Sequence, residues 1–162
     1  DEMPGTAKWV SVGNYPADRH DAAGTVRVVG GTLTTGNYSV IVGADGSGTL
    51  EMVGSAGALT AKTIVLSNAT ESVASFVADA SGFSPMTATN LKIAEGAKLK
   101  VDLSGYTGTK TRFPIFASTT VEGEFADIEV VGGTGKASDY RVVRTATGLS
   151  FAQQKGLLLI LR

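Results

Sequence analysis

The sequence predicts an all-β fold, a parallel β-helix (β-solenoid) with repeats of about 25 residues and a C-terminal cap. Three observations support this prediction. Glycine accounts for 21 of the 162 residues while aromatic residues make up 7%, a composition that favours many turns and thin layers of small side chains. Small apolar or β-branched residues alternate with polar ones over most of the chain, which is typical of half-buried strands. Similar segments also recur at a nearly fixed spacing.

The repeat is clearest between residues 25–37, which read TVRVVGGTLTTGN, and residues 49–63, which read TLEMVGSAGALTAKT. Gly30 and Gly54 occupy the same position in the two copies, 24 residues apart. Copies in a solenoid resemble each other because each strand pairs in register with the strand of the next turn, so that inward side chains recur. We therefore expect the two segments to lie side by side in a parallel ladder. A jelly roll or β-sandwich is the alternative, but it does not predict similar units at a fixed period.

The alternating segments predict strands in chain order at residues 10–12, 26–28, 40–42, 50–52, 99–103, 128–130 and 158–160. A third, degenerate copy of the repeat begins near Ser75 and continues to Ile93. The apolar residues of segment 70–80 (TESVASFVADA) also fit a helical spacing. Its β-branched and small residues are poor helix formers, so we favour a strand there.

The pattern changes after Gly105, where larger, more aromatic and more charged residues appear. We expect a single domain over residues 1–162, with solenoid turns in residues 1–105 and a capping region in residues 106–162, because an uncapped solenoid end exposes unpaired strand edges. Within the cap, residues 127–131 and 140–144 are expected to form a strand pair. The sequence GGTGK between them is expected to form a hairpin turn rather than a phosphate loop, because it lacks the required spacing.

Composition excludes several functions. The net charge of −1 and the even spread of both signs leave no basic stripe for nucleic acid. Without cysteine the chain has no disulfide, no thiolate metal site and no cysteine nucleophile. The most apolar run, residues 157–161, is far shorter than the roughly 20 residues that span a bilayer, so we expect no membrane insertion by this chain. We expect no cofactor either. The start of the chain predicts a piece of a longer protein, with the upstream part of the same polypeptide as one partner.

The insertion at residues 15–23 holds the candidate ligand-contact loop, Asp18, Arg19, His20 and Asp21. A carboxylate beside the single histidine suits acid/base chemistry or part of a metal site. A solvated polar loop on one turn explains the same residues more simply. Because no G-x-S-x-G segment is present, a serine triad built on this histidine is disfavoured, and we expect no catalytic residue and no metal site.

Two further motifs have a structural and a functional interpretation. The segment ADGSG (residues 44–48) contains one carboxylate, too few for Ca²⁺, and is expected to form a turn whose glycines adopt positive φ. Asp79, Asp102 and Lys100 lie on segments that stack in a solenoid, as do the carboxylates and cations of β-helices that cleave acidic polysaccharides. Asp102 alternates with apolar neighbours, however, which is typical of an ordinary outward-facing residue.

The chain resembles the C-terminal region of secreted bacterial autotransporter passengers and adhesin-like β-helix proteins. The resemblance is carried by the segments GTVRVVGGTLTTGN, GSGTLEMVGSAGALTAKTI, LKIAEGAKLKVDLSG and RFPIFASTTVEGEF. It implies a right-handed parallel β-helix, export from the cytoplasm, and a structural or adhesive role without a fixed active site. The chain departs from the family pattern in that no membrane barrel or anchor helix follows Arg162 in this sequence.

These observations together predict a non-catalytic structural or adhesive module of an exported bacterial surface protein, located outside the cell or on its surface. We expect it to bind an extracellular polysaccharide or a host or cell-surface polymer through an extended face of Thr, Ser, Asn and Lys side chains. The alternative is a polysaccharide-binding or polysaccharide-cleaving, lyase-like β-helix, with the loop at residues 18–21 at the edge of its groove.

Overall fold

The computed structural model describes residues 9–13, 23–67 and 71–154, and these form an all-β solenoid of about 4 turns. The described residues form thirteen strands and one short 3-10 helix, η1 (Ala137–Asp139). The strands are β1 (Trp9–Val12), β2 (Ala23–Val29), β3 (Thr32–Thr34), β4 (Ser39–Val42), β5 (Ser47–Val53), β6 (Ala58–Leu66), β7 (Ser72–Val77), β8 (Met86–Ile93), β9 (Lys98–Asp102), β10 (Arg112–Glu122), β11 (Asp127–Val131), β12 (Tyr140–Thr145) and β13 (Gly148–Gln153).

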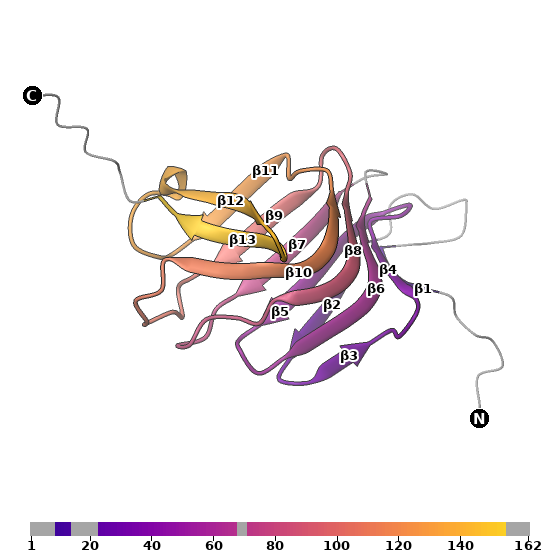
Figure 1. Ribbon diagram of the computed structural model, residues 1–162, viewed down its shortest axis with the longest axis horizontal. Coiled ribbons are helices and arrows are strands. Elements are labelled where there is room, and N and C mark those ends of the chain that lie inside the picture. Colours follow the sequence, from indigo (N-terminus) through magenta and orange to yellow (C-terminus); the bar gives the residue numbers. More distant parts are fainter. Residues whose placement is uncertain (1–8, 14–22, 68–70, 155–162) are drawn as a thin grey trace, which may run out of the picture.

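The strands form two sheets, and the chain alternates between them (Figure 1). Sheet A has the order β1-β4-β6-β8-β10-β13-β12, with β3 also beside β6, and sheet B has the order β2-β5-β7-β9-β11. Every strand from β1 to β11 pairs in parallel with the strand of the neighbouring turn. This confirms the predicted parallel β-helix and rules out the jelly roll, whose strands run antiparallel.

The register confirms the sequence repeat. In sheet B, Thr25 pairs with Thr49 and Thr49 pairs with Val73, so that two successive turns each contain 24 residues. In sheet A, Leu33 pairs with Leu59, which accommodates the small insertion in the second copy. Segment 70–80 contains strand β7, not a helix, because its β-branched and small side chains are placed between β5 and β9.

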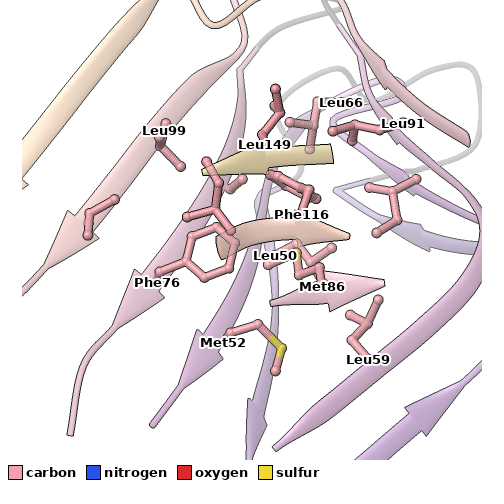
Figure 2. Packing of buried hydrophobic residues seen from close by; sticks show 14 of the residues in the cluster. Leu50, Met52, Leu59, Leu66, Phe76, Met86, Leu91, Leu99, Phe116 and Leu149 are labelled. Carbon is pink, nitrogen blue, oxygen red and sulfur yellow. The ribbon is translucent and has the colours of Figure 1, made fainter. Parts of the chain in front are cut away.

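The core is a column of inward side chains stacked from turn to turn (Figure 2). One sheet B ladder joins Val28, Met52, Phe76, Val101 and Val130 in successive turns. The middle three are fully buried. The Phe76 ring lies 5.0 Å from that of Phe83 and meets Phe116 of sheet A edge-on at 5.7 Å, so aromatic contacts link the two sheets across the interior.

The alternation of buried and exposed residues is interrupted within the strands of sheet A. In β6, Leu59 and Ala61 face inward, as do Ile64 and Leu66, so the alternation of buried and exposed residues slips by one position between them. The strand turns about its axis at this point, because the first half directs its odd-numbered residues toward the core and the second half directs its even-numbered residues. The same slip occurs in β8. In the first turn the chain breaks here into β3 and β4, which pair with the two halves of β6.

The turn at residues 43–46 differs from the predicted one. Gly43 adopts φ +71°, whereas Gly46 and Gly48 do not have positive φ. Gly48 is an extended residue of β5 whose missing side chain lets the strand approach the backbone of Gly43 closely. The expectation that the glycines of ADGSG supply the positive φ is therefore wrong, since the glycine before this segment does so.

Parallel stacking continues past the boundary expected at Gly105. β10 pairs with β8 and β11 with β9, so the solenoid turns extend to Val131. The aromatic residues near Phe113 and Phe116 belong to the core of the last turn; their size made this segment resemble a cap. The closing element is the antiparallel hairpin of β12 and β13, at the end of the molecule opposite β1 and β3 (Figure 1).

Two expectations about this closing region are wrong. Strands β11 and β12 do not pair with each other, because β11 belongs to sheet B and β12 to sheet A. The GGTGK segment leads from one sheet to the other through η1, and the hairpin turn is formed instead by Ala146 and Thr147. The strand expected at residues 158–160 lies outside the described residues.

Candidate functional site

The candidate loop of Asp18, Arg19, His20 and Asp21 lies outside the described residues. Within the described residues, polar side chains gather on the outer face of sheet A. Its polar side chains come from the exposed positions of β6, β8 and β10, which alternate with the core residues described above.

A shallow groove of about 440 Å³ crosses this face, and we call it the hydroxyl groove. The ten residues that line it are threonine, alanine and serine only, namely four alanines with Thr60, Thr87, Thr89, Ser118, Thr119 and Thr147. The register explains the alignment, because Thr34, Thr60 and Thr87 are direct neighbours on β3, β6 and β8. The groove thus presents hydroxyl and methyl groups across three successive strands of the sheet and the turn of the closing hairpin.

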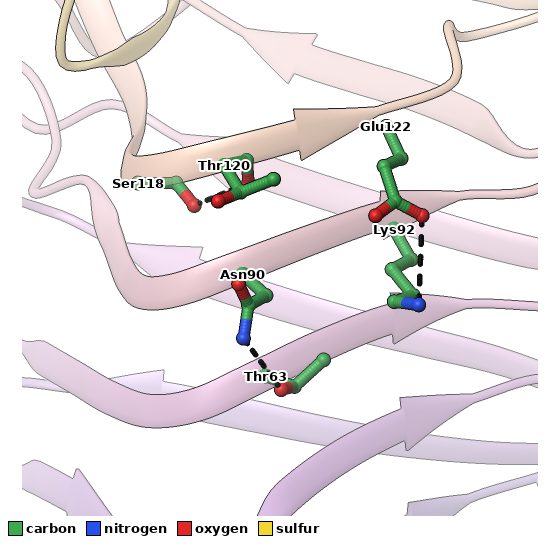
Figure 3. A network of polar contacts seen from close by, with 6 residues as sticks. All are labelled: Thr63, Asn90, Lys92, Ser118, Thr120 and Glu122. Atoms are coloured by element: carbon green, nitrogen blue, oxygen red, sulfur yellow. Dashed lines mark hydrogen bonds and ion pairs between the residues drawn. The ribbon is translucent and has the colours of Figure 1, made fainter.

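Longer polar side chains continue the outer face beside the hydroxyl groove (Figure 3). The side chains of Thr63, Asn90 and Thr120 stand in one row across three strands, and the Asn90 amide donates to the Thr63 hydroxyl at 3.5 Å. Lys92 and Glu122 form an exposed ion pair at 3.5 Å in the next row. Contacts this long contribute little to stability.

Sheet B carries a different outer face, a row of charges. Arg27, Glu51, Ser75, Lys100 and Glu129 are successive partners from β2 to β11. Arg27 pairs with Glu51 at 2.6 Å and Lys100 with Glu129 at 2.8 Å, while the buried Ser75 donates to Glu51. The ion pair with Glu129 raises the pKa of Lys100. Opposite charges in adjacent strands favour this register over a slipped one.

The three residues of the lyase alternative have structural partners. The Asp79 carboxylate accepts hydrogen bonds from the Ser55 amide at 2.7 Å and the Ser55 hydroxyl at 2.8 Å. Asp102 accepts from the backbone amide of Ser104 at 2.8 Å, and Lys100 is paired with Glu129. Each carboxylate therefore closes a corner of the solenoid through its oxygen atoms, a role that also accounts for its position at the end of a strand.

The hydrogen bonds from Ser55 lower the pKa of Asp79, with the backbone amide as the main cause and the hydroxyl second; the Ser81 amide adds to them. A carboxylate with a lowered pKa stabilises the fold above the pKa of the unfolded chain, and this contribution is lost as pH falls through the folded pKa. We expect Asp79→Asn to be less stable than the wild type at pH 7, and the difference to shrink below about pH 4, near the unfolded value. Urea unfolding of both proteins at pH 7, 5 and 3 measures this difference in stability.

Asp45→Asn provides the matched control for this prediction. It removes the same charge from an exposed turn position, so it separates the local hydrogen bonds of Asp79 from the change in net charge. A stability difference between Asp79→Asn and the wild type that stays constant from pH 7 to pH 3 would contradict the assigned role of the carboxylate.

The closing hairpin covers a cavity of about 270 Å³ between β11 and β12, whose lining combines apolar side chains with Glu124, Arg141 and Arg144. Ile93, Phe125 and Leu149 line it, and Arg144 seals its edge by donating to the carbonyl oxygens of Val121 at 2.5 Å and Gly123 at 3.0 Å. Because the arginine satisfies two carbonyls at the end of β10, we assign this region to the sealing of the solenoid end.

Within residues 9–13, 23–67 and 71–154, no group of three or more His, Cys, Asp or Glu side chains is placed to hold a metal ion. The helices of this part of the chain include none with the length and apolarity that crossing a membrane requires. Comparison with protein-family models, with curated proteins and with solved structures finds no match for this chain.

Proposed function

We propose that the chain is a non-catalytic structural or adhesive module of an exported bacterial surface protein, and that it binds an extracellular polymer through the outer face of sheet A. The observation that supports this proposal most directly is the hydroxyl groove, whose lining is restricted to threonine, alanine and serine. Hydroxyl groups donate and accept hydrogen bonds, while the methyl groups of the threonines and of Ala117 and Ala146 offer apolar contact. Such a lining suits the mixed polar and apolar surface of a polysaccharide.

The spacing of the groove favours a chain-like ligand over a compact one. Neighbouring strands lie about 4.8 Å apart, so equivalent side chains such as Thr60 and Thr87 repeat at that interval along the solenoid axis. A polymer laid across several turns makes many weak contacts at once, and their combined affinity replaces that of a single deep pocket.

The two ends of the solenoid differ, and the difference supports the upstream part of the same polypeptide as a partner. At the C-terminal end the hairpin of β12 and β13 covers the core. At the other end, Val10, Val26 and Leu33 face the core but are only half-buried, and within the described residues nothing pairs with the outer edges of β1 and β2. A preceding solenoid turn with inward apolar residues would bury these side chains and satisfy the strand edges.

Binding to insoluble polymers tests the proposal. We expect the wild-type chain to be retained by at least one of chitin, cellulose, cross-linked pectate or purified bacterial cell wall, and Thr87→Lys to lower the apparent affinity about tenfold by filling the groove. Thr25→Lys is the matched control, since it makes the same exchange at an exposed position of sheet B. The role of the hydroxyl groove would be refuted if the polymers retained both variants equally, or if none of the polymers retained the wild type.

A further inference from the structure

The corner loops that lead from sheet B to sheet A grow along the chain. The first loop that leads from sheet A to sheet B has ten residues, 13–22, and contains the insertion, whereas the later loops at this corner keep nearly the same length, with 4, 5, 4 and 4 residues in successive turns. Loops that lead from sheet B to sheet A lengthen from 2 to 4, 8 and 9 residues, the longest being residues 103–111, and the last connection, residues 132–139, has 8. A solenoid needs only short corners to close its turns, so the extra residues at this second corner, which we call the elaborated corner, serve another purpose.

At the C-terminal side of the elaborated corner, loops 103–111 and 132–134 enclose a cavity of about 530 Å³. Aromatic residues supply its apolar wall, including the half-buried Tyr106 and the buried Tyr140. Thr134 and Gln153 supply hydroxyl and amide groups. The cavity therefore has the size of a typical small-ligand pocket and its usual composition of an apolar lining with a few polar groups.

The wall of the cavity is held in place before any ligand binds. The Tyr106 ring packs edge-on against Phe113 at 4.9 Å, and its hydroxyl accepts a hydrogen bond from the Lys110 amide at 2.7 Å. On the facing side, the Tyr140 hydroxyl accepts from the Thr134 amide at 3.0 Å and donates to the Thr134 carbonyl. Gln153 also donates to the Thr134 carbonyl. Such restraints lower the entropy that a ligand must overcome to bind.

The charge of the lining defines the ligand further. Among the described residues that line the cavity, Lys110 is the only charged one, and none carries a carboxylate. An ammonium group at the rim favours an anionic ligand through charge-assisted hydrogen bonds, while the aromatic wall and the hydroxyl and amide groups suit a sugar ring. An acidic sugar meets all three conditions.

We propose that this cavity of the elaborated corner is a binding site for uronate-containing oligosaccharide, with Lys110 contacting the sugar carboxylate and Tyr106 the sugar ring. This inference deepens the polymer-binding role and rests on it only for the class of ligand, because the cavity and the hydroxyl groove are lined by different residues. The groove holds an extended chain weakly, whereas the cavity selects for charge.

Titration of the isotope-labelled full chain with tetragalacturonate, followed by NMR, tests the site. We expect the amide signals of residues 106–111 and 132–134 to shift, and added salt to weaken binding because one ion pair carries the selectivity. Cellotetraose, which has the same ring count and no carboxylate, should bind more weakly. Shifts centred on Thr60 and Thr87 instead, or no shift with tetragalacturonate, would overturn the proposal.

A pair of lysine variants separates this site from the outer face of sheet A. We expect Lys110→Gln to lower the affinity for tetragalacturonate about tenfold and to leave the affinity for cellotetraose unchanged. Lys62→Gln removes the same charge from β6 and should leave both affinities unchanged. If Lys110→Gln binds tetragalacturonate as the wild type does, the charge-selective cavity is refuted. The retention of insoluble polymers and its loss in Thr87→Lys would then still decide the proposed function independently.

Discussion

Replacing Phe76 with alanine is expected to lower the free energy of unfolding by about 3–5 kcal/mol. The ring is fully buried and touches Phe83 and Phe116, so its removal opens a cavity between the two sheets at the middle of the core. Neighbouring turns hold these side chains in register, which limits how far the core relaxes into the space. Urea unfolding monitored by circular dichroism measures the loss.

Val77→Ala is the control for this prediction, since Val77 follows Phe76 in β7 but faces outward and is half-exposed. We expect it to cost less than about 1 kcal/mol, in line with substitutions away from the core. Similar losses in the two variants would mean that sheet B does not direct Phe76 into a packed interior.

Gly123→Ala is expected to lower the free energy of unfolding by about 2–5 kcal/mol, the sum of a backbone cost of about 1–2 and an overpacking cost of about 1–3. Gly123 has φ +80°, a conformation that residues with a Cβ atom rarely adopt. A Cβ atom at this position would also overlap the Ile93 carbonyl of the preceding turn. The substitution therefore strains the chain locally and separates two turns.

Gly96→Ala isolates the backbone cost from the overpacking cost. Gly96 has φ +90° at the same corner one turn earlier, but a Cβ atom there would have no neighbour within 4 Å. We expect a loss of only about 1–2 kcal/mol, measured by urea unfolding alongside Gly123→Ala. Equal losses in the two variants would show that the turns tolerate a methyl group between them, contrary to the close approach at Gly123.

The architecture could be predicted from sequence wherever the repeat was regular. The 24-residue spacing of Gly30 and Gly54 correctly predicted the parallel pairing of β2 with β5, because ladder pairing forces equivalent residues to recur. Beyond Gly105 the same reasoning failed. The final turns have longer corners and larger core residues, so their period no longer matches, although β10 and β11 still pair in parallel.

The candidate sites were harder to predict, for a physical reason. The hydroxyl groove brings together Thr60 and Thr87, which are 27 residues apart, whereas partners in β5, β7 and β9 of sheet B are 24 or 25 apart. Only the number of residues in each corner determines which threonines become neighbours. Once the 24-residue register was found, the opposite charges of Arg27 and Glu51 were a usable signal that the sequence analysis missed.

The cavity at the elaborated corner was even harder to predict from the sequence. Its lining includes residues of two loops and Tyr140 and Gln153 of the closing hairpin, whereas the sequence pattern predicted that residues 140–144 pair with residues 127–131. Alternation predicts strands but gives no information about how far a loop extends beyond the sheet edge. Loop length in successive turns, counted from strand to strand, was the one available indication.

The constant 24-residue spacing of the first turns in sheet B also determines how the gene for this chain can change in length. Insertion of one codon within a strand turns the later side chains of that strand to the opposite face, whereas duplication of a whole 24-residue turn preserves the register on both sides of the new segment. Because the closing hairpin contacts only the last turns, it would seal the lengthened molecule unchanged. The fold thus accepts increments of one turn, and the length of the solenoid is adjustable without redesign of its end.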